Sequence, residues 1–140
     1  MAIRIEARPW AEMIEHACRV YPEECVGVML GAIDDGSKTV QAALPMENVT
    51  SGPRLERYQL ASADLRAADA EARRRGLTLV GIYHSHPDCD AYFSQTDLEN
   101  SCPWYSFVVL SIRQGRFAHA NSWLPDEEQK TARKETLLTE

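Results

Sequence analysis

Long apolar runs are missing from this sequence, and so is an excess of positive charge. No stretch approaches the roughly 18 consecutive apolar residues that a membrane-spanning helix needs, so we expect no membrane partner. The first ten residues, MAIRIEARPW, hold no apolar core of the kind found in a secretory signal. The 15 Lys and Arg against 21 Asp and Glu give a net charge of −6, which argues against nucleic acid as a partner.

Cysteine is too sparse to support a disulfide-based fold. The chain has four cysteines in 140 residues: Cys18, Cys25, Cys89 and Cys102. Without a secretory signal, they are expected to be free thiols in a cytoplasmic protein. A length of 140 residues is enough for one domain with a normal core, and a hydrophobic content of 44% is ordinary for a globular chain.

The hydrophobic pattern predicts alternating strands and helices. Apolar residues at helical spacing run from Pro9 to Tyr21, and a second helix follows Ser62, which can cap it, and stops at Gly76. Six apolar segments are predicted strands: 3–6, 25–33, 39–46, 77–86, 105–112 and 116–123. The order β-α-β-β-α-β followed by β-β predicts an α+β or three-layer α-β-α domain.

Two segments lie outside these elements. Residues 47–61 show no clear period and are predicted to form a loop. Residues 126–140 form a charged tail. We expect this tail to be a helix that docks on the domain through Leu137 and Leu138. The domain itself is therefore expected to span residues 1–125.

The most informative segment is His84-Ser85-His86-Pro87, at the end of the strand predicted over 77–86. Residues two apart on a strand point to the same face, so the two histidine Cβ atoms lie about 7 Å apart. Both imidazoles can then reach one metal ion, since a zinc–nitrogen bond is about 2.0–2.1 Å long. Pro87 cannot donate a ladder hydrogen bond and should end the strand, so that the following loop can return Asp97 as a third ligand. Two histidines and a carboxylate leave one tetrahedral position free, as in catalytic zinc sites.

Asp97 also has a second interpretation. Ser94-x-x-Asp97 is a helix capping pattern, in which the serine hydroxyl and the acidic side chain bond to main-chain N–H groups at the start of a helix. Ser94 can cap a helix and also serve a site. We do not expect Asp97 to serve both roles, and the spacing by itself leaves the two interpretations of Asp97 open.

The histidine pair with Ser94 and Asp97 at this spacing resembles the JAMM motif of the MPN+ family of zinc-dependent, deubiquitinase-like peptidases. The resemblance covers roughly residues 3–123. It implies the MPN fold, a cytidine-deaminase-like arrangement around a central mixed sheet, with residues 1–125 as the catalytic domain. It also implies one zinc ion per chain, bound by His84, His86 and Asp97.

The family draws a catalytic glutamate from just after the first helix, which corresponds to Glu24, while Glu23 would be a solvated neighbour. Glu24 would act as general base and proton shuttle, and Ser94 would help to hold the developing oxyanion. Cys89 fits no position of the motif. As a thiolate it could bind zinc and block the enzyme, but we favour an ordinary loop thiol.

The resemblance implies hydrolysis of a peptide or isopeptide bond at the C-terminal Gly-Gly of a ubiquitin-like or sulfur-carrier protein. The alternatives are a phage-type or cell-wall peptidase with the same motif, and a non-catalytic MPN scaffold. A zinc deaminase is disfavoured, because neither H-x-E nor P-C-x-x-C occurs in the chain. Substrate specificity is expected to come from residues 47–61 and 98–104.

Overall fold

The computed structural model describes residues 2–55 and 57–139, which form seven strands and three helices. In chain order these are β1 (Ala2–Ile5), α1 (Ala7–Val20), β2 (Val26–Asp34), β3 (Ser37–Met46), α2 (Ser62–Arg74), β4 (Thr78–Pro87), α3 (Gln95–Glu99), β5 (Ser106–Arg113), β6 (Arg116–Pro125) and β7 (Ala132–Thr139). The predictions for 1–125, 47–61 and 126–140 also included Met1, Glu56 and Glu140, which lie outside the described residues. Every predicted strand and helix within 2–125 is present, with bounds that differ by at most two residues.

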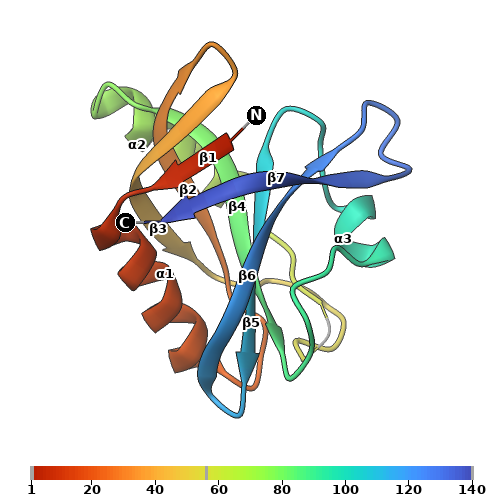
Figure 1. Ribbon diagram of the computed structural model, residues 1–140. Coiled ribbons are helices and arrows are strands. Elements are labelled where there is room, and N and C mark those ends of the chain that lie inside the picture. The colour runs from red at the N-terminus through yellow and green to blue at the C-terminus, as the bar shows by residue number, and fades with distance from the viewer. Residues whose placement is uncertain (1, 56, 140) are drawn as a thin grey trace.

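The strands form one mixed sheet that closes into a barrel in the order β1-β3-β2-β4-β5-β6-β7 (Figure 1). β4 pairs in parallel with β5, and β1 pairs in parallel with both β3 and β7. The remaining neighbours are antiparallel. The prediction of an α+β fold with a central mixed sheet is therefore confirmed.

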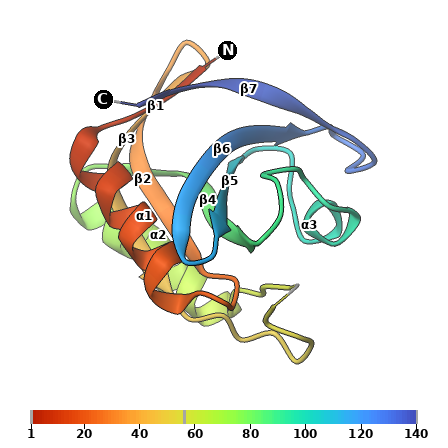
Figure 2. The same cartoon turned by 60° about the horizontal axis from the view of Figure 1, so that its bottom comes forward.

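Two hydrophobic clusters cover the two faces of the sheet. In one, Met13 of α1 packs with Tyr83 of β4. In the other, Ala68 and Ala72 of α2 pack with Ile82, the neighbour of Tyr83 on the same strand. Because successive side chains on a strand point to opposite faces, α1 and α2 lie on different sides of the sheet, as in the predicted three-layer arrangement. Figure 2 shows α3 well away from both.

The C-terminal ends of α1 and α2 follow local rules, whereas the cap predicted at the start of α2 is absent. α1 ends at Val20 with Tyr21 as its C-cap, directly before Pro22, within one residue of the prediction. α2 is followed by Gly76 in the left-handed region at φ 73°, as predicted. Ser62, however, does not cap α2. The N-cap is Ala61 in extended conformation, and Ser62 is already the first helical residue. No helix in residues 2–55 and 57–139 combines the length and apolar character needed to cross a bilayer.

The helix predicted within 126–140 is wrong, because residues 132–139 form strand β7. This strand pairs antiparallel with β6 and parallel with β1, and so closes the barrel. Leu137 packs against the core as predicted, whereas Leu138 is 39% exposed. The main-chain groups of β1 and β6 gain hydrogen-bond partners from β7, which a docked helix could not supply.

A buried glutamate explains why the charge pattern of this segment was misleading. Glu135 of β7 is only 5% exposed. Its carboxylate accepts hydrogen bonds from Ser106 at 2.7 Å and from Ser122 at 2.9 Å, and Lys38 donates to Ser106 at 2.6 Å. A charged side chain can be buried when it is bonded in this way, so the charge of the tail did not mark a solvated helix.

Candidate metal centre

Strand β4 places both histidines of the motif on one face of the sheet. It lies between antiparallel β2 and parallel β5, with His84 opposite Val109 and His86 opposite Ser111. Both rings are buried, at 0% and 3% exposure. Ser85 between them points the other way, and its hydroxyl accepts the main-chain N–H of Cys25 at 2.8 Å. The period-2 argument from the sequence therefore holds, and the two Nε2 atoms lie 3.3 Å apart.

Asp97 reaches the histidines from the first turn of α3. Its Oδ2 atom lies 3.1 Å from His84 Nε2 and 3.0 Å from His86 Nε2. The same carboxylate accepts the N–H of Ser94 at 3.1 Å, and the Asp97 N–H donates to the Ser94 hydroxyl at 3.0 Å. Both halves of the capping box are thus present. The expectation that Asp97 would not serve both roles is wrong, because the box is what aims its carboxylate at the histidines.

His84, His86 and Asp97, called the metal group from here on, fit a zinc ion. Their donor atoms are 3.0 to 3.3 Å from one another. Tetrahedral ligands at about 2.0–2.1 Å from one zinc ion are separated by about 3.3 Å. Nitrogen and carboxylate donors of this number are also those of catalytic zinc sites.

The protonation states suit metal binding. Burial lowers the pKa of His84 below its ordinary 6.5, although the Asp97 carboxylate opposes this effect, so the ring is neutral near pH 7. Burial alone would raise the pKa of Asp97, but attraction and hydrogen bonds from His84 and His86 bring it well below its ordinary 3.8. His86 donates its Nδ1–H to the carbonyl of Asp90 at 2.9 Å. This bond leaves Nε2, which faces the other two ligands, as the ring nitrogen that can bind a metal.

Aromatic rings fix the orientation of both imidazoles. Tyr58 stacks on His84 with ring centroids 4.4 Å apart and planes 26° apart. Tyr92 meets His86 edge-on at 4.8 Å. Neither tyrosine was identified from the sequence. The one sequence feature that could have pointed to them is an aromatic residue in a segment with no helical or strand period.

Glu24 and Ser94 line the same cavity as His86. The cavity has a volume of about 480 Å³, and its walls also include Leu55, Pro87, Cys89, Tyr92 and Thr96. Glu24 is 5% exposed there, whereas Glu23 is an exposed surface residue. The structure thus brings together all five residues predicted for the site, since His86 belongs to the metal group. The catalytic roles assigned to Glu24 and Ser94 stay predictions.

Cys89 also lines this cavity but does not belong to the metal group. Among the described residues, the metal group is the one set of three or more His, Cys, Asp or Glu residues whose donor atoms lie within 4.8 Å of one another. Burial raises the pKa of the Cys89 thiol, with a further rise from the charge of Glu24, so the protonated form is favoured. All four cysteines are free, as predicted.

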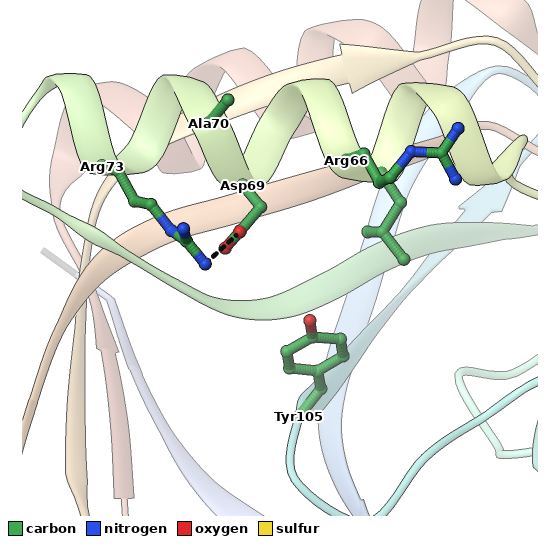
Figure 3. Close-up of a pocket in the computed structure, with 6 residues that line it drawn as sticks. Arg66, Asp69, Ala70, Arg73 and Tyr105 are labelled. Atoms are coloured by element: carbon green, nitrogen blue, oxygen red, sulfur yellow. Dashed lines mark ion pairs between the residues drawn. The ribbon is translucent and has the colours of Figure 1, made fainter.

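A second cavity, of about 550 Å³, lies along α2 and contains none of these residues. It is lined by Leu65, Arg66, Asp69, Ala70 and Arg73 of α2 and by Tyr105 (Figure 3). Arg73 and Asp69 form an exposed ion pair at 3.0 Å. With no donor of the metal group and no Glu24 in its walls, this cavity is not the reaction site.

Comparisons with known proteins place the chain in one protein family. The family described as prokaryotic homologs of the JAB domain matches residues 6–126. The chain is 37% identical over 107 residues to the desampylase of Haloferax volcanii, covering 76% of this chain and 73% of that protein. It is 32% identical over 102 residues to the CysO-cysteine peptidase of Mycobacterium tuberculosis, covering 72% and 67% respectively.

A solved structure, that of protein DSY2949 from Desulfitobacterium hafniense, superposes with a TM-score of 0.86. The superposition covers 99% of this chain and 92% of that one at 23% identity, which shows the shared fold. Together with the metal group, the family match and the two relatives show that this chain belongs to the prokaryotic JAB-domain proteins and is a JAMM-type metallopeptidase.

Proposed function

We propose that the protein is a zinc-dependent peptidase that binds one zinc ion per chain through the metal group and hydrolyses the bond after a C-terminal Gly-Gly sequence. The observation that carries this proposal is the convergence of three buried donors, 3.0 to 3.3 Å apart, beside a cavity whose wall holds a buried glutamate. The free cysteines support a cytoplasmic location.

Zinc, Glu24 and Ser94 each have a chemical role in this proposal. Bound zinc would act as a Lewis acid on the scissile carbonyl and make water a better nucleophile. Glu24 takes the proton from the attacking water and delivers it to the leaving amine. The Ser94 oxygen already accepts the Asp97 N–H, so its own hydroxyl hydrogen remains available to donate to the developing oxyanion.

The proposed substrate is a ubiquitin-like or sulfur-carrier protein joined through its C-terminal Gly-Gly to an amino acid, a peptide or a lysine side chain. The names of the desampylase and the CysO-cysteine peptidase point to substrates of this class for those relatives. The cavity supports such a substrate here. Leu55 and Tyr92 are 56% and 50% exposed at its wall, so their apolar surfaces can contact an extended Gly-Gly segment. Glycine also accepts main-chain angles that other residues do not.

The test is a panel of purified ubiquitin-like proteins from the host, each carrying a C-terminal extension, compared with casein and cell-wall peptides. We expect cleavage directly after Gly-Gly, read by mass spectrometry, with little turnover of casein. The Glu24→Gln variant serves as the inactive control. Cleavage of the cell-wall peptides alone would replace this proposal with the cell-wall peptidase, and no cleavage by a zinc-loaded protein would favour the scaffold.

A further inference from the structure

The position of Glu24 depends on residues 47–61, which we call the anchoring loop. Glu24 lies between the end of α1 and the start of β2, outside both elements. Its N–H donates to the carbonyl of Arg54 at 2.6 Å, and its carbonyl accepts the side-chain amide of Asn48 at 3.2 Å. The main chain of this glutamate is therefore bonded on both sides to a segment that has no helix or strand of its own in its described residues.

Asn48 is the centre of the anchoring loop. Its Nδ2 donates to the carbonyls of Glu24 at 3.2 Å and Arg57 at 2.9 Å. Its Oδ1 accepts the N–H groups of Thr50 at 3.2 Å and Gln59 at 3.0 Å. These two carbonyls and two N–H groups identify which end of the Asn48 side-chain amide is nitrogen and which is oxygen. The four bonds also use all the donors and acceptors of that amide.

The same amide reaches the metal group through its other partners. Arg57 and Gln59 flank Tyr58, whose buried ring stacks on His84. Asn48 thus joins the main chain of Glu24 directly to the three-residue segment that packs on a metal ligand. On its C-terminal side, Glu24 is also linked to β4 by the sheet, because the Cys25 N–H donates to the Ser85 hydroxyl and Val26 of β2 pairs with His84. Asn48 adds a second link from the loop, so the spacing between Glu24 and His84 is set in part by one side chain.

From these contacts we infer that Asn48 is a positioning residue, which holds the Glu24 carboxylate in register with the metal group. The inference rests on the proposed function, in which Glu24 moves a proton. A general base must lie within hydrogen-bonding reach of the proton that it takes. A displacement of about 1 Å at such a group lowers a rate about 100-fold. Asn48 itself does not touch the reacting atoms, because its four bonds all end on the main chain.

The first test is a double-mutant cycle between Asn48 and Glu24 on a Gly-Gly-extended substrate. Asn48→Ala should lower kcat about 30- to 100-fold in the wild type, by the displacement argument, and less than about threefold in the Glu24→Gln background. Asn48→Asp, which keeps both acceptor bonds and loses both donor bonds, should behave like Asn48→Ala. Equal fold-losses in the two backgrounds would show that Asn48 does not act through Glu24, and would overturn the inference.

Thr50→Ala is the matched control. Thr50 lies in the same loop, is half-buried like Asn48, and its hydroxyl accepts one loop N–H, that of Gly52, at 3.2 Å. The substitution removes one loop hydrogen bond without touching Glu24, so kcat should stay within about twofold of the wild type. A loss as large as that of Asn48→Ala would mean that any loosening of the loop suffices, and the specific role of Asn48 would be wrong.

A second readout is independent of turnover. Hydrogen exchange of the Glu24 amide should accelerate at least tenfold in Asn48→Ala and in Asn48→Asp but not in Thr50→Ala, with zinc content unchanged in all three. Exchange at wild-type rate would overturn the inference even if activity fell. A wild type that cleaves no substrate would remove the proposed function, and the exchange measurement would then decide by itself whether Asn48 anchors Glu24.

Discussion

The metal group and Glu24 face one cavity, but different kinds of structure hold them. His84 and His86 belong to a strand with hydrogen-bonded neighbours on both sides, and Asp97 is fixed by a capping box at the start of α3. Glu24 belongs to no helix or strand, and its main chain is bonded to a loop further along the chain, at Asn48 and Arg54. The ligands are thus positioned by regular structure, whereas the base depends on its place just before β2 and on a few loop contacts. We expect the two parts to fail separately.

The largest effect should come from the metal group. His86→Ala removes one of three ligands and the ring that bonds to the Asp90 carbonyl, so the protein should lose zinc and all measurable cleavage together. Metal analysis of the purified variant, with the assay repeated in added zinc, checks this. A variant that binds zinc stoichiometrically and turns over would show that His86 is not a ligand.

The next effect separates the two parts of the site. Glu24→Gln should retain zinc, because the metal ligands are unchanged. Its kcat should fall about 10²–10⁴-fold, because an amide cannot transfer a proton. Glu23→Gln is the matched control on the exposed neighbour and should be close to wild type. Normal turnover in Glu24→Gln beside an inactive Glu23→Gln would mean that the wrong carboxylate was chosen.

A smaller effect concerns stability on the Glu24 side. His16 lines a cavity that Glu24 also borders, and its Nδ1 is bonded to the Tyr83 hydroxyl at 2.8 Å. Burial, with a contribution from Arg19, lowers its pKa from 6.5 to about 4, so the unfolded chain binds this proton more readily. The free energy of unfolding should therefore fall as the pH drops from 6.5 to 4.

The comparison with His16→Gln isolates this titration. Between pH 6.5 and 4, the free energy of unfolding of the wild type should fall by about 2 kcal/mol more than that of the variant, after allowance for solvent at the cavity edge. Urea unfolding at each pH measures this difference. All other titratable groups are the same in both proteins, so their contributions cancel in the difference. Parallel pH profiles would contradict the assigned protonation of His16.

The smallest effect is expected at Cys89, which lines the cavity between the two parts. Since burial favours its protonated thiol, Cys89→Ser should leave zinc content and turnover within about twofold of the wild type. A severalfold rise in activity would show instead that the thiol competes for the open coordination position.

The same contrast explains what the sequence could predict. His84, His86 and Asp97 follow from local rules, the alternation of a strand and the spacing of a capping pattern. The sequence predicts that Asp97 either completes the capping box or binds metal. It does not show that a single carboxylate oxygen can face two histidines and a main-chain N–H at once. Asn48, Tyr58 and Leu55 were missed, since a loop without a period gives no sign of what it packs against. Strand β7 was missed because Glu135 is charged, and its burial depends on serines and a lysine from three other strands.

X-ray absorption at the zinc edge of the zinc-loaded protein tests the central claim most directly. We predict one ion per chain with nitrogen and oxygen neighbours at about 2.0–2.2 Å, two of them imidazoles, and no sulfur at about 2.3 Å. A sulfur neighbour would place Cys89 on the metal and contradict the open catalytic position. Failure to take up a stoichiometric divalent ion would contradict the zinc peptidase itself.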